Sequence, residues 1–276
     1  MGGDERRRQL AEYLARQGYA DLSVLVAELG VSESTVRRDL SQLEEERIAR
    51  RTHGGAVFVS DRLSALNYSE RESAAVAEKE AIGRLAASLV GDSDTILLDG
   101  GTTTYQVARH LMTRSLQVVT NSLPIANLLA NASSIELIFV GGYIYPRTGV
   151  ALGPIATQTI EALNVSKAFM GLAGITEDAL YNANMLMVET EQQMMRCADE
   201  VIVVADHTKF GKRGLAQLGG WNLIDRMITD AGVEPKWRDI LHKADVELIV
   251  AEVAESAASP ARSGFTGNGG AVAPPC

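Results

Sequence analysis

Seven short apolar runs, separated mostly by segments long enough for a helix, follow residue 95 and constrain the fold most strongly. They cover residues 95–99, 117–121, 135–141, 167–171, 201–206, 226–230 and 245–251. Such alternation is typical of parallel strands joined by crossover helices. The uninterrupted apolar character of 96–98 and 201–204 predicts strands buried on both faces. We therefore expect an α/β domain with an open, largely parallel sheet that collects ligands at the carboxyl ends of its strands.

The first of these strands ends in glycines and threonines that lead directly into a helix. The run comprises Asp99, Gly100, Gly101, Thr102, Thr103 and Thr104. Glycines let the backbone approach a ligand, threonine hydroxyls donate hydrogen bonds, and a helix amino terminus offers free N–H groups and a positive dipole end. The run is therefore built like a phosphate-binding turn. Taken alone, it is equally compatible with a well-capped helix that binds nothing.

Similar chemistry recurs at the ends of later strands. The residues concerned are Asn121, Ser122, Gly141, Gly142 and Lys209, and Glu189 adds an ionisable group. Because simple helix capping does not require glycine pairs at several strand ends, the recurrence favours a ligand site. Lys209 is a candidate cation for a phosphate or carboxylate, and a solvated loop lysine is the alternative.

The amino-terminal stretch 30–56 has the pattern of a helix-turn-helix. A helix over 32–45 has one narrow apolar stripe, formed by Val36, Leu40 and Leu43. Its opposite side carries hydroxyls and guanidinium groups, namely Ser34, Arg37, Arg38 and Ser41. Ser32 can cap its first turn, and a helix over 22–29 precedes it. An ordinary helical hairpin with solvated arginines is the alternative.

Two strand-like segments joined by glycines follow that helix. Residues 48–52 and 56–59 flank the turn 53–55, which predicts a wing. Its candidate contacts to the DNA backbone are Arg50, Arg51 and His53. A first helix is expected over 4–17, with arginines at positions 6, 7 and 8 in its first turn, where the dipole disfavours cations. A phosphate contact or a solvated terminus would explain them.

The amino-terminal motif resembles a known family. Residues 31–43 follow the pattern V-S-x-x-T-[IV]-R-R-D-L-x-x-L, and H-G-G-A closes the wing. This resembles the DNA-binding domain of the DeoR family of bacterial transcriptional regulators. The resemblance adds Thr35 to a set of residues expected at double-stranded operator DNA: Ser32, Ser34, Thr35, Arg37, Arg38, Ser41, Arg50, Arg51 and His53. Arg47 departs from the family, which usually ends this helix on glycine; a left-handed cap at a non-glycine residue costs about 1 kcal/mol.

The strand-end series DGGTTT, VTNS, VGG, VETE and ADHTKFG is similar, in order and spacing, to the effector domain of the same family. That domain resembles sugar-phosphate isomerases such as ribose-5-phosphate isomerase and binds phosphorylated sugars or sugar intermediates. The resemblance places the sugar phosphate at residues 99–103 and Asn121, the pocket wall at Gly141 and Gly142, and an anionic group at Lys209. Thr104, Ser122 and Glu189 complete the candidate effector residues. Glu191 and Gln192 stand where the family often has Lys or Arg, which bears on the identity of the ligand.

The resemblance implies a DNA-binding transcriptional regulator, a repressor of a carbohydrate-metabolism operon that a phosphorylated metabolite releases from its operator. The rival is a sugar-phosphate isomerase-like enzyme, which needs a positioned carboxylate base. Related isomerases carry an acidic loop where residues 170–174, MGLAG, have no carboxylate. Glu189 or Asp99 could supply a base in principle. A DNA-bound scaffold with an idle pocket is a third hypothesis. We predict no catalytic residue, no cofactor and no metal site.

Charge and composition bound the partners and the compartment. The formal net charge is -9, but residues 1–60 hold nine arginines against ten carboxylates, so their share is only -1. A modest positive patch on an acidic protein suits a binder of a few specific DNA sites. No apolar run approaches the roughly 20 residues of a membrane span, and the charged start does not fit a secretory signal, so we expect a cytoplasmic protein. Cys197 and Cys276 are too few for a disulfide framework.

The chain length and the pattern changes predict two domains and two connecting or terminal segments. We expect a winged helix-turn-helix domain over 1–59, a linker over 60–77, an α/β effector domain over 78–251 and a disordered tail over 252–276. We also expect a homo-oligomer, dimeric or tetrameric, because a single small winged domain makes few base contacts and paired half-sites raise specificity.

Overall fold

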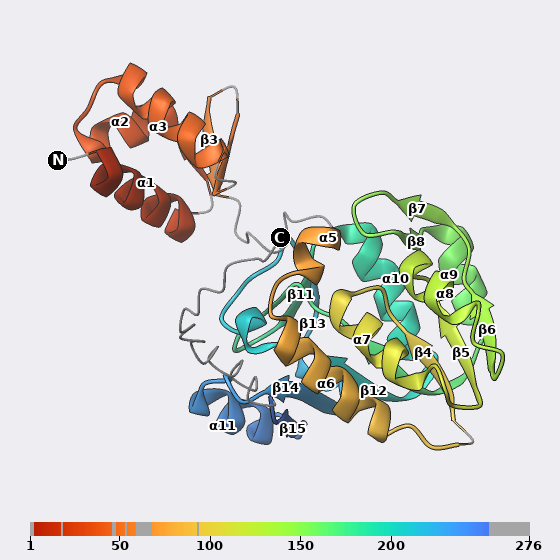
Figure 1. Ribbon diagram of the computed structural model, residues 1–276. Coiled ribbons are helices and arrows are strands. Elements are labelled where there is room, and N and C mark those ends of the chain that lie inside the picture. Colours follow the sequence, from red (N-terminus) through yellow and green to blue (C-terminus); the bar gives the residue numbers. More distant parts are fainter. Residues whose placement is uncertain are drawn as a thin grey trace, which may run out of the picture.

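A computed structural model provides the fold (Figure 1). The structure describes residues 3–17, 19–45, 48–52, 54–58, 68–92 and 94–253. Arg47, His53, residue 59 of the predicted DNA-binding domain, residues 60–67 of the predicted linker and residues 254–276 of the predicted tail lie outside this part. Within it, no helix combines the length and the apolar character that crossing a membrane would require.

The amino-terminal domain is a three-helix unit with a small antiparallel sheet. Its elements are α1 (Gly3–Gln17), β1 (Tyr19–Asp21), α2 (Leu22–Leu29), α3 (Glu33–Glu45), β2 (Ala49–Arg51) and β3 (Gly55–Phe58), and the strand order is β1-β3-β2. The predicted apolar stripe of α3 is buried together with Leu10 and Leu25. The helix-turn-helix and the wing are thus confirmed. Gly30 ends α2 in the left-handed region, with φ of 63°, which a glycine adopts without strain.

The larger domain is organised around a parallel sheet of seven strands in the order β15-β14-β12-β9-β4-β5-β6. The strands are β4 (Thr95–Leu98), β5 (Leu116–Thr120), β6 (Ile135–Phe139), β9 (Val165–Met170), β12 (Ala198–Val204), β14 (Arg226–Asp230) and β15 (Glu247–Ala251). All seven apolar runs of the sequence form strands of this one sheet. The predicted fold class, an open parallel sheet beside a winged helix-turn-helix, is confirmed.

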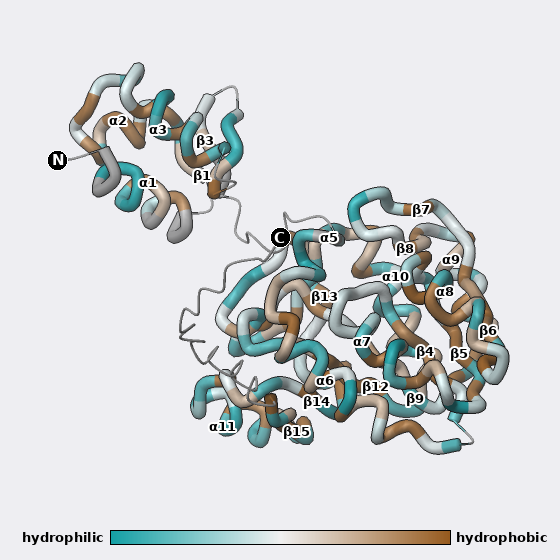
Figure 2. Tube along the Cα trace, viewed as in Figure 1, coloured by the Kyte–Doolittle hydropathy of each residue, from teal (hydrophilic) through white to brown (hydrophobic). Residues whose placement is uncertain are grey.

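Helices cover both faces of this sheet. One set is α6 (Val76–Ser88), α7 (Thr102–Leu111) and α8 (Leu123–Leu129); the other is α9 (Pro154–Glu161), α10 (Met185–Arg196) and α11 (Pro235–Lys243). Ile96 and Leu98 belong to a core with the first set, whereas Leu97 belongs to a core with the second. Figure 2 shows the corresponding hydrophobic colouring along the central strands β4 and β5. Burial on both faces explains why these strands are apolar without alternation.

Several shorter elements were not predicted. They are α5 (Tyr68–Glu72), the hairpin β7 (Tyr143–Tyr145) and β8 (Val150–Leu152), the antiparallel sheet of β10 (Gly174–Ile175), β11 (Leu180–Asn182) and β13 (Ala216–Gly219), and the 3-10 turns η1 (His207–Lys209) and η2 (Trp221–Leu223). Helix α5 falls inside the range 60–77 that the sequence predicts as a linker. Helix α5 is the first element after β3 of the wing in the described part of the chain.

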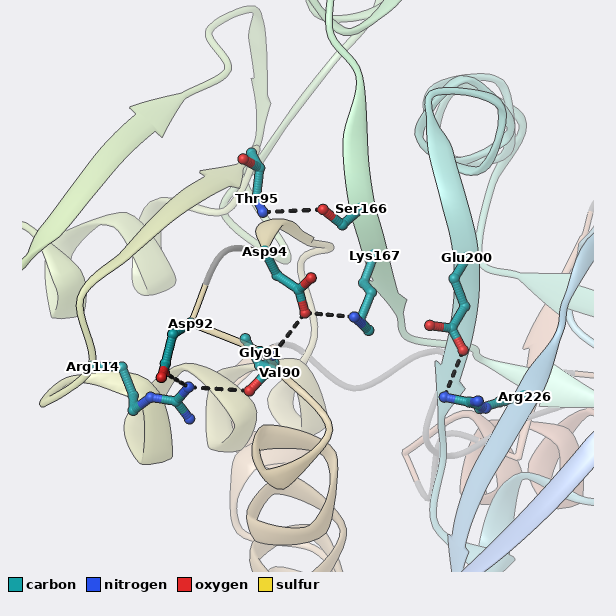
Figure 3. A network of polar contacts seen from close by, with 10 residues as sticks. All are labelled: Val90, Gly91, Asp92, Asp94, Thr95, Arg114, Ser166, Lys167, Glu200 and Arg226. Atoms are coloured by element: carbon teal, nitrogen blue, oxygen red, sulfur yellow. Dashed lines mark hydrogen bonds and ion pairs between the residues drawn. The ribbon is translucent and has the colours of Figure 1, made fainter.

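Polar side chains at the amino ends of the parallel strands pair with one another (Figure 3). Lys167 Nζ lies 2.5 Å from Asp94 Oδ2, and the backbone N–H of Gly91 donates to the same oxygen at 2.7 Å. Burial alone would raise the pKa of Asp94, but these two hydrogen bonds outweigh it and lower the pKa. Arg226 similarly pairs with Glu200 at 2.7 Å. This end of the sheet is closed by satisfied charges, so the candidate chemistry lies at the other end.

Candidate nucleic-acid interface and strand-end cavity

Helix α3 presents a polar face with one arginine available to a partner. Ser34, Arg37 and Arg38 are exposed, as the helical wheel predicts. Arg37 is engaged by Glu33, with Nε to Oε1 at 2.9 Å. Arg38 has no hydrogen bond or ion pair to any residue in the described part of the chain. Its guanidinium is therefore left available to a partner molecule.

The first turn of α3 is capped by hydroxyl groups that were also predicted at the DNA. Ser32 Oγ accepts a hydrogen bond from the backbone N–H of Thr35 at 3.3 Å and lies 2.8 Å from Thr35 Oγ1. Ser32 thus acts as the amino-terminal cap of α3, as its position predicts. Both hydroxyls are held at the amino end of the helix, where N–H groups favour an anion such as a DNA phosphate.

The wing is fastened to α3 through Arg51. Arg51 Nε donates to Glu44 Oε2 at 2.7 Å, Nη1 donates to Ser41 Oγ at 2.9 Å, and the backbone N–H donates to Glu44 Oε1 at 3.0 Å. The backbone hydrogen bond, followed by that of the side chain, lowers the pKa of Glu44. Arg51 therefore fixes the angle between wing and helix. Arg50, on the same strand, is exposed and makes no hydrogen bond or ion pair with the described residues, although its charge helps to lower the pKa of Glu44.

A buried ion pair anchors α3 from its inner side. Arg6 Nε lies 2.5 Å from Asp39 Oδ2, and Nη2 lies 3.1 Å from Oδ1. Asp39 is only 2% exposed and sits among the apolar residues of the stripe. The sequence left the role of Arg6 open between a phosphate contact and a solvated terminus. The structure assigns Arg6 to neither, because its fork is bound to Asp39 on the recognition helix.

The second site is a small cavity of about 30 Å³ at the carboxyl ends of β4, β9 and β12. We call it the strand-end cavity. Six predicted effector residues line it: Asp99, Gly100, Gly101, Thr102, Thr103 and Lys209. The remaining lining comes from Arg71, Gly171, Leu172, Asn182, Met187, Val204 and Ala205, which the sequence did not single out. The structure thus gathers residues of α5, β11, α10 and η1 around the predicted glycine-threonine turn.

The amino end of α7 forms one wall of the strand-end cavity. Gly101 is its amino-terminal cap, and Thr104 Oγ1 accepts a hydrogen bond from the backbone N–H of Gly101 at 2.8 Å. Thr104 is consequently used within the helix, whereas Thr102 and Thr103 line the cavity. Gly100 has a separate role, because a Cβ there would lie 2.0 Å from Val150 Cγ1. Only glycine lets β8 approach this turn.

Two buried carboxyl groups lie near each other at this site, and one of them, Asp99, lines the cavity. Asp99 is 3% exposed, and burial raises its pKa to about 6 against backbone hydrogen bonds that lower it. One of these is donated by Gly171 N to Asp99 Oδ2 at 3.1 Å. Glu191 is 1% exposed; burial and the nearby Asp99 raise its pKa, although Asn182 Nδ2 donates to its Oε1. Glu191 Oε2 has no hydrogen-bond partner in the described part of the chain.

Two cationic residues, Arg71 and Lys209, also line the cavity. Lys209 is buried, and Arg71 extends from α5 with Nε and Nη2 both buried and without hydrogen-bond partners among the described residues. Behind them, Lys79 Nζ donates to the carbonyl oxygens of Arg71 and Ala74, each at 2.5 Å. Burial lowers the pKa of Lys79 to about 8. The cavity therefore combines donors for an anion with acceptors for hydroxyl groups.

Other predicted effector residues do not line the cavity. Asn121 Nδ2 donates to the carbonyl oxygen of Ala151 at 3.1 Å, and Ser122 caps α8 by accepting from Ile125 N at 3.4 Å. A Cβ on Gly142 would lie 2.8 Å from the carbonyl oxygen of Leu152, so this glycine serves the close approach of β8. Gly141, which precedes it, and the exposed Glu189 on α10 are likewise outside the lining.

Comparison with known families settles the ancestry of the chain. A family model described as the DeoR C terminal sensor domain matches residues 74–231, and one described as the DeoR-like helix-turn-helix domain matches residues 6–62. The chain belongs to the DeoR family. The resemblance found in the sequence is confirmed. Neither family model matches residues 63–73, so helix α5 and its residue Arg71 lie between the two matched ranges.

Relatives in the DeoR family match over nearly the whole chain. The HTH-type transcriptional repressor GlcR of Bacillus subtilis is 33% identical over 91% of this chain and 98% of its own length. The glycerol-3-phosphate regulon repressor of Escherichia coli is 31% identical over 84% of this chain and 92% of its own. Among solved structures, ribose 5-phosphate isomerase A of Methanocaldococcus jannaschii overlaps 48% of this chain and 53% of its own at 20% identity and a TM-score of 0.35.

Proposed function

We propose that this DeoR-family protein is a sequence-specific transcriptional repressor that a phosphorylated sugar or related metabolite releases from double-stranded operator DNA. The relatives named above are repressors, and the winged helix-turn-helix is joined to a sensor domain. The observation that carries the proposal is the strand-end cavity, where a helix amino end, two threonines and two cations converge on one small space. A repressor of chromosomal genes would act in the cytoplasm.

Recognition of DNA would run through α3 and the wing. Arg38 has the planar fork that binds the O6 and N7 atoms of guanine, and Ser34 lies on the same exposed face. Arg50 on the wing would contact phosphate, which sets the position of the domain rather than its sequence preference. Arg37, Ser41 and Arg51 would shape this surface. The Arg37 side chain is already bound to Glu33, and that of Arg51 to Glu44 and Ser41.

Binding of the effector would use both chemical halves of the cavity. The free N–H groups at the start of α7, the hydroxyls of Thr102 and Thr103, and the positive charge of Lys209 suit a phosphoryl group. Asp99 and Asn182 suit the hydroxyls of a sugar. An uncharged sugar would lose the first set of interactions, so the effector's affinity should depend on its phosphoryl group.

A titration of the protein–DNA complex tests this proposal. Operator fragments selected from genomic DNA would be bound to the full chain and challenged with a panel of sugar phosphates and their dephosphorylated forms. Thr103→Val should bind operator normally but need more effector for release, because it loses a hydroxyl donor far from α3. Thr159→Val, an exposed threonine on α9, is the matched control. Equal release by phosphorylated and free sugars would contradict the proposal.

A sugar-phosphate isomerase is the second candidate, and one observation supports it. Asp99 lies in the cavity lining with its pKa raised to about 6 by burial, a value suited to a general base near neutral pH. Glu189, the other candidate base, is exposed outside the lining. We favour a regulator without catalysis. Isomerisation of a sugar phosphate by the wild-type chain, abolished in Asp99→Asn, would instead assign the enzyme.

The remaining organisation of the chain is also proposed. The DNA-binding domain would span 1–59, the connection 60–77, the effector domain 78–251 and the tail 252–276. A homo-oligomer, dimeric or larger, would place two winged domains on two half-sites. These half-sites would be separated by one or more helical turns of DNA, at about 34 Å per turn. Light scattering that finds a monomer at micromolar concentration, with full operator affinity, would exclude this arrangement.

A further inference from the structure

We propose that Arg71 binds the anionic group of the effector and that helix α5 carries this event toward the wing. The inference rests on the proposed function, because it specifies how the same cavity holds its ligand and how the DNA-binding domain responds. Arg71 lies outside both matched family ranges, and its assignment comes from the contacts of its side chain.

Arg71 lines the cavity, and two of its three guanidinium nitrogens leave their hydrogen-bonding capacity unused. Nε and Nη2 are both buried, and neither has a hydrogen-bond partner in the described part of the chain. The ring of Tyr68 lies 6.0 Å from its carbon Cζ, and burial lowers the pKa of Arg71. A buried donor without a partner is costly. Nε and Nη2 together form the planar fork that binds a phosphate or carboxylate through two parallel hydrogen bonds.

The size of the cavity requires its lining to move when a metabolite enters. Its volume of about 30 Å³ can hold about a water molecule, whereas small-molecule pockets commonly reach 300 Å³ or more. The ends of β4, β9 and β12 are fixed in the central sheet, and α7 and α10 pack into its two cores. Helix α5 has only five residues and contributes Arg71 alone to the lining. It is the lining element that can shift with least disruption.

Helix α5 is joined to α6 through a segment with the features of a hinge, and in the other direction the chain leads to the wing. On the α6 side, Ala75 adopts a left-handed conformation with φ of 50°, and Lys79 Nζ binds the carbonyl oxygens of Arg71 and Ala74. A non-glycine residue in this region is strained, which is common at switch positions. On the other side, only residues 59–67 separate α5 from β3 of the wing. Movement of α5 therefore displaces the point from which the DNA-binding domain is tethered.

Tyr68 couples α5 to the phosphate-binding turn itself. Its ring packs edge-on against Tyr105 of α7, with centroids 6.4 Å apart, and its backbone N–H donates to the carbonyl oxygen of Arg147 at 3.0 Å. The Tyr68 hydroxyl is buried without a hydrogen-bond partner in the described chain. An anion bound at the start of α7 would therefore contact Arg71 of α5, and α5 is also held to α7 through Tyr68 and Tyr105.

The test compares Arg71→Gln and Arg71→Lys with Arg84→Gln, an exposed arginine on α6. Binding of inorganic phosphate and of fructose 6-phosphate to the full chain would be measured by thermal shift and calorimetry. Hydrogen exchange of residues 68–75 would be followed with and without phosphate, with α11 as the internal reference. We expect Arg71→Gln to weaken binding roughly tenfold to a hundredfold, as for hydrogen bonds to a charged group. Arg71→Lys should be intermediate, because it keeps the charge but loses the fork.

The outcomes separate the inference from the function on which it rests. Phosphate-dependent exchange in 68–75 of the wild type that is lost in Arg71→Gln, with Arg84→Gln unaffected, supports the inference. If wild type and Arg71→Gln bind phosphate equally, Arg71 is a structural seal and the inference fails while the proposed function stands. If the wild type binds neither probe, the inference fails, whereas the proposed function fails only if the whole panel of sugar phosphates also leaves the operator complex intact. If tryptophan fluorescence shows that Arg71→Gln is not stably folded, the phosphate affinity of Arg71→Lys decides. An Arg71→Lys affinity equal to that of the wild type would overturn the role of the fork.

Discussion

Replacing Asp99 with asparagine should stabilise the α/β domain at neutral pH. Burial raises the pKa of Asp99 from its ordinary value of 3.8 to about 6. The folded state therefore holds this proton more tightly than the unfolded chain. The sign follows: wild-type stability is undiminished below about pH 4, falls as pH rises toward 6, and stays reduced above that. Asparagine keeps an oxygen to accept from Gly171 N and carries no charge to bury.

The magnitude follows from the pKa difference. At about 1.4 kcal/mol per pH unit, the ionised carboxylate costs the fold about 3 kcal/mol at pH 8. Asp99→Asn should recover most of this at pH 8 and nothing near pH 4. Glu191, whose pKa is raised by the same burial and by Asp99, should gain its own charge more readily once Asp99 is neutral.

Urea unfolding followed by tryptophan fluorescence is a suitable assay. Both tryptophans of the chain, Trp221 and Trp237, lie in the α/β domain, so the signal reports on that domain. The difference in unfolding free energy between wild type and variant would be measured from pH 4 to pH 8. Asp178→Asn, at an exposed position, is the control and should show no difference. A variant less stable than wild type at pH 8, or a difference independent of pH, would refute the argument from burial.

Three further predictions concern the winged domain and the packing of the helices. Arg38→Ala should weaken operator binding by about 1 to 3 kcal/mol if Arg38 contacts a guanine. Gel-shift titration would measure this, with Arg196→Ala on α10 as the control. An Arg38→Ala variant that binds operator with wild-type affinity would show that Arg38 contacts no base. Asp39→Asn should lower the melting temperature of the amino-terminal domain in circular dichroism, because Arg6 loses its buried partner, and an unchanged melt would show the pair to be dispensable. Gly83→Ala would place a Cβ 2.7 Å from the backbone carbon of Gln106 and should cost about 1 to 3 kcal/mol by forcing α6 from α7; Gly91→Ala, with its nearest contact at 3.4 Å, should be tolerated.

The sequence predicted the elements whose burial imposes a local pattern. The strands of the central sheet are covered on both faces, so β4 and β12 had to be apolar runs, and α3 had to carry a stripe. The hairpin β7–β8 and the sheet of β10, β11 and β13 have strands of two to four residues, too short to show a period. Asp39 offered a missed signal, since a carboxylate on the apolar stripe of a helix requires a cationic partner.

The candidate site was predictable in part for a similar reason. Asp99, Thr102 and Thr103 follow a strand directly, so their place at the sheet edge is set by local order. Arg71 and Asn182 reach the cavity from α5 and β11, whose positions depend on tertiary packing alone. The assignment of Asn121 rested on its own strand end, where the side chain turns to β8 and binds Ala151. Strand order locates a site, but side-chain direction there depends on the neighbouring elements.

The contrast between the two ends of the parallel sheet bears on how such proteins diverge. At the amino ends Asp94 pairs with Lys167, and Arg226 pairs with Glu200, so a substitution there would leave a charge without its partner. At the carboxyl ends Arg71 and Glu191 keep unused hydrogen-bonding capacity, so exchanging them removes little that the fold depends on. If the cavity binds the effector as proposed, descendants of one ancestor can acquire a new effector by changing its residues while the scaffold and its stability are inherited intact. The freedom to change specificity is thus confined to one edge of the domain.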